Sequence, residues 1–156
     1  MPNFIVGARL HDYGKGTPDE LFGKVSADGF AAVQLAYKKC VPTVKSYADV
    51  TDALVAETVA AEKAHHIQVA VGTYVELAIN DESRLCNVAD FKSQLAVCKA
   101  LGAGCIGTET TAMSKQPAGT TRAQAQELLC RSLAEILPAA EALGVTVGIE
   151  PVTYHS

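Results

Sequence analysis

Polar and ionisable residues stand beside short apolar runs throughout this sequence. Glu109 and Glu150 each come directly after such a run, Gln34 lies within one, and His11 and Asp12 follow the first. If these groups meet in the folded chain, the carboxylates and the imidazole could exchange protons with a substrate. Carboxylate oxygens are also ligands that Mg²⁺ and Mn²⁺ prefer. Whether the groups meet depends on the elements that carry them.

Each candidate also has a purely structural explanation. A glutamate after a strand, such as Glu109, is often a solvated loop residue, and Gln34 could satisfy loop backbone groups instead of lining a pocket. The functional interpretation has more support at Glu150, which follows its apolar run directly and precedes the stiffening Pro151. Both interpretations stay open for His11.

The apolar runs are predicted to be β-strands. They are short, and they cover residues 4–8, 32–35, 67–74, 105–108 and 145–149. Helical periodicity and capping patterns fill the intervals, over residues 17–28, 49–65, 88–101 and 121–143. Pro138 lies inside the last of these helices, where it should produce a kink or a break.

One internal repeat links the candidate glutamates to this pattern. Residues 99–102 read Lys-Ala-Leu-Gly and lead through a strand to Glu109, and residues 141–144 read Glu-Ala-Leu-Gly and lead through a strand to Glu150. In both copies a glycine ends the helix, a buried strand follows, and a glutamate closes the strand. The period of about 40 residues suits one strand–helix unit with its loops.

The alternation of strands and helices indicates a parallel sheet, and the near-continuous apolar runs indicate strands covered on both faces. Two α/β architectures fit, a (β/α)₈ barrel and an open doubly wound sheet. The open sheet usually carries a G-x-G-x-x-G phosphate loop after its first strand, and residues 9–14 lack that pattern. We therefore predict that residues 1–156 form one domain, an incomplete TIM barrel with about five strands and four helices of the eight of each. A nucleotide-binding open sheet is the alternative.

Ligands of parallel α/β proteins bind at the carboxyl ends of the strands. Every predicted strand of this chain delivers a polar or ionisable residue to that end. These residues are His11, Gln34, Tyr74, Glu76, Glu109, Glu150 and His155. Their convergence is the main functional signal in the sequence.

Two of the strand ends resemble a known family. Gly-Thr-Glu-Thr at residues 107–110, and Gly-Ile-Glu-Pro-Val at residues 148–152 followed by His155, are similar to motifs of the sugar phosphate isomerase/epimerase family, within the xylose isomerase-like TIM-barrel superfamily. The order of the units matches over all 156 residues. The resemblance implies an isomerase or epimerase that moves a proton next to the carbonyl of a sugar or sugar phosphate.

The resemblance also implies roles for particular residues. Glu150 would be a divalent-metal ligand and an acid or base near the substrate, and His155 would contact the substrate. Glu109, Gln34 and His11 would line the sugar pocket. The metal would be Mn²⁺, Mg²⁺, Zn²⁺ or Co²⁺. The family's remaining ligands, an aspartate, a histidine and a second glutamate, come from strands six to eight.

The length of the chain bears on these expectations. A complete barrel has about 250 residues, and this sequence ends at Ser156, before strands six to eight. We therefore expect a truncated portion that is inactive by itself. The first and last strands would have open edges, through which two copies could pair as a homo-oligomer. A second hypothesis is a non-catalytic partial barrel that acts as an interaction module.

Composition and charge disfavour several other functions. The net charge is −4 with no block of like charge, so nucleic-acid binding is not expected and a DNA-repair endonuclease would lack its basic groove. No run reaches the roughly 20 apolar residues of a membrane span. The five cysteines are odd in number and lack C-x-x-C spacing, which indicates free thiols and a cytoplasmic protein.

Overall fold

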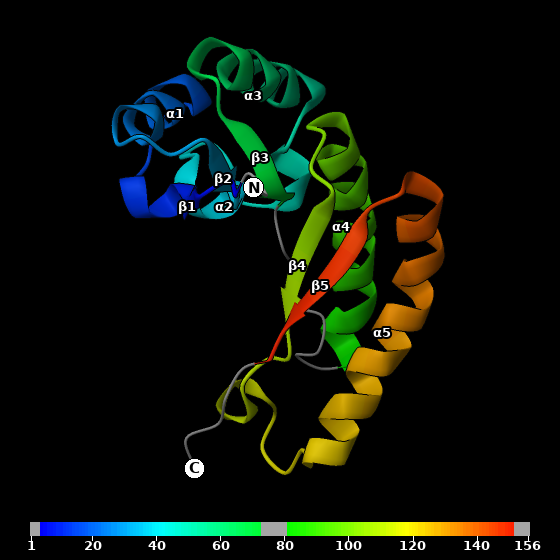
Figure 1. Cartoon of the computed structure of the whole chain (residues 1–156). Helices are drawn as coiled ribbons and strands as arrows, with labels where there is room; N and C mark the ends of the chain where they lie inside the picture. Colours follow the sequence, from blue (N-terminus) through cyan, green and yellow to red (C-terminus); the bar gives the residue numbers. More distant parts are fainter. Residues whose placement is uncertain (1–3, 73–80, 152–156) are drawn as a thin grey trace.

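Five parallel strands form the centre of the structure, a computed structural model that describes residues 4–72 and 81–151 (Figure 1). The strands are β1 (Gly7–Arg9), β2 (Ala32–Gln34), β3 (Gln68–Gly72), β4 (Cys105–Glu109) and β5 (Thr146–Glu150). The α-helices are α1 (Pro18–Ala27), α2 (Tyr37–Cys40), α3 (Asp52–His65), α4 (Asp81–Ala100) and α5 (Arg122–Leu143). Short 3₁₀ helices lie in the connections, namely η1 (Leu10–Tyr13), η2 (Tyr47–Asp49) and η3 (Met113–Lys115).

Each strand from β2 to β5 pairs in parallel with the strand that precedes it in the chain, so the order in the sheet is β1-β2-β3-β4-β5. This is the strand order of a barrel wall, whereas a doubly wound sheet reverses its order at a switch point. The predicted fold class is therefore confirmed, because the described residues form the parallel (β/α) units of a partial TIM barrel. The alternative of an open doubly wound sheet is wrong.

The two faces of the sheet have different neighbours. On β4, the side chains of Ile106 and Thr108 are buried, while Cys105 and Gly107, which alternate with them, are only half-buried. Helices α4 and α5 lie side by side along one side of β4 and β5 (Figure 1). The helices therefore cover an outer face, and the alternate residues of each strand point to the opposite, inner face.

Two predicted capping boxes are present at helix starts. Thr17 Oγ1 accepts a hydrogen bond from the Glu20 N–H at 3.3 Å, and Glu20 Oε2 accepts one from the Thr17 N–H at 2.9 Å. Thr121 and Gln124 repeat this exchange at the start of α5, at 3.3 and 2.8 Å. These bonds satisfy N–H groups that a first helical turn leaves unpaired, so they fix where α1 and α5 begin.

Several element boundaries differ from those expected from the sequence. β1 spans Gly7–Arg9 rather than residues 4–8, and the apolar side chains of residues 4–6 are between 57% and 86% exposed. A β-branched run has strand propensity whether or not a partner covers it. A prediction based on propensity therefore starts this strand too early. α4 begins at Asp81 rather than at residue 88. The predicted start is too late because the first turns of this helix are polar and lack apolar periodicity.

Helix α5 continues through Pro138, so the predicted break is wrong. A proline removes the hydrogen bond to the carbonyl four residues earlier, here that of Ala134. Both residues are exposed, so water can bind the carbonyl that loses its partner. Ile136 and Ala140, on the buried side of the same turns, are 0% and 2% exposed and hold the helix against the core.

The cysteines are free thiols, as predicted. Burial raises the pKa of Cys40 to about 11 and the pKa of Cys98 to about 12. Because the thiolate is the nucleophile, these two thiols are unreactive at neutral pH while the protein is folded.

Among residues 4–72 and 81–151, no helix has both the length and the hydropathy needed to cross a bilayer. β1 and β5 are the edges of the described sheet. Cytoplasmic location, the absence of nucleic acid and self-association through these edges stay predictions.

Candidate functional site

Glu109 and Glu150 lie side by side at the carboxyl ends of β4 and β5. They are the last residues of the two strands and are partners in the parallel register. The alternation that places Cys105 and Gly107 on the inner face places both glutamates there as well. The Glu109 side chain is 18% exposed, and Lys115 Nζ lies 3.6 Å from its Oε1. Neighbouring like charges repel, so packing alone does not favour this pair of carboxylates.

A hollow of about 250 Å³ lies on the inner face beside these strand ends. Glu150 lines one part of it, and Gln34, at the end of β2, lines another. Val71 of β3 pairs in register with Gln34 and with Cys105, so the hollow extends across neighbouring strands. The structure thus brings Gln34 and Glu150 to one hollow, with Glu109 next to Glu150.

The two carboxylates provide part of a donor set for a divalent cation. Their oxygens suit Mg²⁺ or Mn²⁺. Within the described residues, however, no cluster of three or more His, Cys, Asp or Glu side chains could hold a metal ion. Glu150 can therefore supply one ligand, and a complete site needs further groups from outside the part of the chain that the structure describes.

The backbone that follows Glu109 has a strained residue. Thr111 has φ +39°, in the left-handed region that β-branched residues rarely adopt, and its side chain is buried. Just before it, the Thr110 N–H donates a hydrogen bond of 3.1 Å to the Glu150 carbonyl. This bond ties the loop after β4 to the end of β5. Strained residues persist where the surroundings fix them, and they cluster at functional sites.

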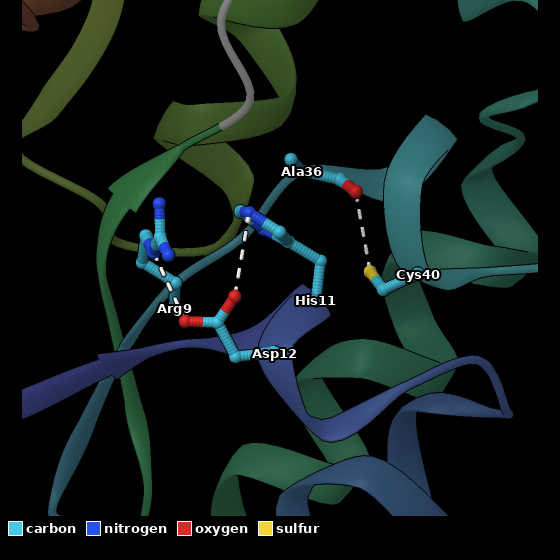
Figure 2. A network of polar contacts seen from close by, with 5 residues as sticks. All are labelled: Arg9, His11, Asp12, Ala36 and Cys40. Carbon is cyan, nitrogen blue, oxygen red and sulfur yellow. Dashed lines mark hydrogen bonds and ion pairs between the residues drawn. The ribbon is translucent and has the colours of Figure 1, made fainter.

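A second polar cluster lies at the ends of β1 and β2. Arg9 closes β1 and pairs in register with Gln34. Its Nε donates a hydrogen bond of 3.0 Å to Asp12 Oδ2, and His11 Nε2 lies 3.9 Å from Asp12 Oδ1 (Figure 2). The His11 side chain is 18% exposed. His11 therefore stands at the expected rim of the sheet, but it does not line the hollow beside Glu150.

The surroundings of His11 favour its neutral form. Burial lowers its pKa, the positive charges of Lys39 and Arg9 lower it further, and only the carboxylate of Asp12 opposes them. The Nδ1 atom is buried and has no hydrogen-bond partner within the described residues. Since a protonated ring would carry an N–H at Nδ1, protonation would leave a buried donor unpaired.

This burial predicts an acid-dependent loss of stability. Below about pH 6.5, the ordinary pKa of histidine, the unfolded chain binds a proton at residue 11 that the folded chain does not yet bind. The free energy of unfolding should therefore fall as the pH is lowered from that value toward the lower folded pKa. Urea denaturation at several pH values, compared between the wild type and His11→Gln, measures the effect. The variant should lose less stability than the wild type on acidification, and identical pH profiles would contradict the assignment.

His155, Tyr74 and Glu76 lie outside the described residues. The sequence pattern gives no sign that the charges of Arg9 and Lys39 act on His11. Their placement depends on where β1 ends and on the short helices η1 and α2, which periodicity does not predict.

The sequence matches one family model. The family model for the xylose isomerase-like TIM barrel matches residues 22–156. A comparison with curated proteins gives no match.

Solved structures share the fold at low sequence identity. 3-Keto-D-glucoside 4-epimerase YcjR from E. coli has a TM-score of 0.73 at 14% identity, over 96% of this chain and 57% of its own. D-Psicose 3-epimerase from Clostridium cellulolyticum H10, solved with D-tagatose, has a TM-score of 0.69 at 16% identity, over 90% of this chain and 50% of its own. A xylose isomerase-like TIM barrel protein from Mycobacterium smegmatis, in complex with magnesium, has a TM-score of 0.67 at 15% identity, over 93% and 54%.

This chain thus spans about half the length of the solved structures that it resembles. At these identities the likeness concerns the fold alone. The family model, in contrast, covers most of the sequence and includes both strand-end glutamates. The parallel strand order and the family match lead to the same conclusion, that the chain belongs to the xylose isomerase-like TIM barrel family.

Proposed function

We propose that this chain supplies the strand-end carboxylates of a sugar isomerase or epimerase, which moves a proton next to a carbonyl with the help of a divalent cation. The observation that supports the proposal best is the register pairing of Glu109 with Glu150, beside a hollow that Gln34 also lines. The solved structures named above, two epimerases and one magnesium complex, are consistent with it.

The chemistry needs a base and a way to stabilise negative charge. In this proposal Glu150 removes a proton from the carbon next to the carbonyl, which leaves an enediolate. Glu109, which lies beside it, is the second carboxylate that can return the proton. The side-chain amide of Gln34 has hydrogen-bond donors and a hydrogen-bond acceptor, so it can bind sugar hydroxyl groups in the hollow.

A divalent cation, when bound, would stabilise the charge on the enediolate oxygens as a Lewis acid, with Glu150 among its ligands. The described residues hold only part of such a ligand set. We therefore assign the activity to a completed barrel, which we define as a polypeptide that contains this chain together with the strands beyond β5. The chain alone is expected to be inactive.

Proton exchange with solvent tests this proposal. The completed barrel is incubated in D₂O with Mn²⁺ or Mg²⁺ and a panel of neutral ketoses and ketose phosphates. We expect NMR spectra to reveal deuterium at the carbon next to the carbonyl of at least one sugar. A completed barrel that is folded and binds the metal, yet exchanges no proton in any sugar of the panel, would favour the non-catalytic interaction module instead.

A further inference from the structure

We infer that a hollow between η2, the start of α3 and one side of α4 binds a small organic ammonium ion, a ligand with an apolar body and a positively charged nitrogen. The hollow has a volume of about 450 Å³, which lies in the range of small-molecule sites. Among the described residues, no strand residue lines it, so it is separate from the hollow at the strand ends. The inference is independent of the function proposed above.

Small and apolar side chains form most of the walls. On α4, Ala89, Ser93 and Val97 recur every four residues, so they lie on one side of the helix. Val50 and Val55 form part of the opposite wall, around the start of α3 (Figure 1). The three valines are half-buried, and the apolar body of a ligand would remove their remaining surface from water.

Gln94 is the most deeply placed residue of the hollow. Of the described residues that line it, Gln94 is the buried one, with 1% of its surface exposed. Its Oε1 atom has no hydrogen-bond partner within the described part of the chain. A buried acceptor without a partner costs free energy, and a ligand N–H that reaches this atom would recover the cost.

A chain of hydrogen bonds fixes which atom of the Gln94 amide is left over. The Ser93 hydroxyl donates its hydrogen to the Asp90 carbonyl at 2.7 Å, and a hydroxyl group has only one hydrogen to donate. Ser93 Oγ can therefore only accept from Gln94, and Gln94 Nε2 donates to it at 3.3 Å. The amide nitrogen is thus in use, and the amide oxygen is not. Because the terminal torsion of a glutamine side chain is soft, a small rotation presents Oε1 to a ligand in the hollow.

The charged residues that line the hollow are both acidic. Asp52 lies in the first turn of α3, and Asp90 lies on α4, so the carboxylates come from opposite walls. Within residues 4–72 and 81–151, no lysine or arginine lines the hollow. Lys38 lies over the ring of Tyr47, with its Nζ 4.7 Å from the ring centroid, but it is not a lining residue. A bound cation would therefore meet negative groups on two sides.

An ammonium ion matches this set of groups. It carries several N–H donors and no acceptor, whereas Gln94 Oε1 and the two carboxylates are acceptors. An anionic ligand would be repelled by both aspartates. An uncharged apolar ligand would fill the hollow but leave Gln94 Oε1 without a partner.

Binding of phenethylammonium and of its uncharged analogue, phenethyl alcohol, to this chain tests the inference without any turnover. Calorimetry gives the affinities, and NMR shifts of the Gln94 amide protons and the Val97 methyl groups give the location. The ammonium should bind more tightly than the alcohol by about tenfold or more, because it alone makes charge-assisted hydrogen bonds with the carboxylates. Equal affinities would overturn the inference and indicate an uncharged apolar ligand instead.

Two substitutions test the acceptor and the charge separately. Gln94→Leu should weaken ammonium binding by about tenfold. It should leave the midpoint of urea denaturation unchanged or raise it, because a buried acceptor without a partner is removed. Asp90→Asn keeps the shape of the side chain and should weaken binding of the ammonium several-fold but not that of the alcohol. Glu57→Gln, at an exposed position of α3 outside the hollow, is the matched control for the loss of one carboxylate and should leave both affinities unchanged.

An ammonium affinity that is the same in Gln94→Leu and Asp90→Asn as in Glu57→Gln would overturn the inference, as would the absence of saturable ammonium binding to the wild type. The two proposals fail separately. No residue of the strand ends takes part in this experiment, and proton exchange with sugars needs no residue of this hollow.

Discussion

Glu150→Gln should lower the turnover of the completed barrel by about 10²- to 10⁴-fold, the range that a positioned general base contributes. The amide keeps the size of the side chain but can neither accept the proton nor bind a cation as a carboxylate does. Initial rates of proton exchange in D₂O, with saturating sugar, measure the loss.

The same substitution should not weaken the fold. Glu150 is exposed and faces the like charge of Glu109, so its neutralisation removes a repulsion. The melting temperature should be unchanged or slightly raised. Glu141→Gln, at an exposed position near the end of α5, is the control for the loss of one carboxylate and should retain full turnover. If Glu150→Gln also keeps wild-type turnover, the role assigned to Glu150 is wrong.

Gly72→Ala should destabilise the chain by about 1–3 kcal/mol, as overpacking of a filled core does. A Cβ at this position, the end of β3, would lie only 2.0 Å from Cys98 Sγ and 3.4 Å from Cys98 Cβ. Cys98 lies on α4 and is fully buried, so its sulfur has little room to move. Urea denaturation measures the loss.

A double-mutant cycle separates this contact from a general effect of alanine. In a Cys98→Ala background the sulfur is absent, and Gly72→Ala should cost clearly less than in the wild type. Gly104→Ala is the control, because a Cβ there meets no atom within 4 Å. An equal cost of Gly72→Ala in both backgrounds would show that contact with Cys98 is not the reason.

The repeat that pairs Glu109 with Glu150 could be predicted because each step of it has a local cause. Gly102 and Gly144 have φ +69° and +67° at the ends of α4 and α5, a conformation that favours glycine. β4 and β5 each have five residues, and their parallel register pairs Glu109 with Glu150. The local pattern therefore predicts both the parallel fold and the position of the two carboxylates at the same edge of the sheet.

Other features depend on contacts that a local pattern does not contain. Residues 4–6 have strand propensity but stay exposed, and Pro138 is tolerated because it faces solvent. The approach of Arg9 and Lys39 to His11 depends on two short helices, η1 and α2, that have no periodic signal. The roles of His11, Gln34, Glu109 and Glu150 in binding or catalysis stay predictions, as does that of His155.

A crystal structure of the completed barrel with Mn²⁺ and a ketose would test the central claim most directly. The account predicts that the sugar lies against the inner face, in contact with Gln34, and that the anomalous signal of Mn²⁺ lies beside the Glu150 carboxylate. A sugar bound elsewhere, with the metal away from Glu150, would contradict it.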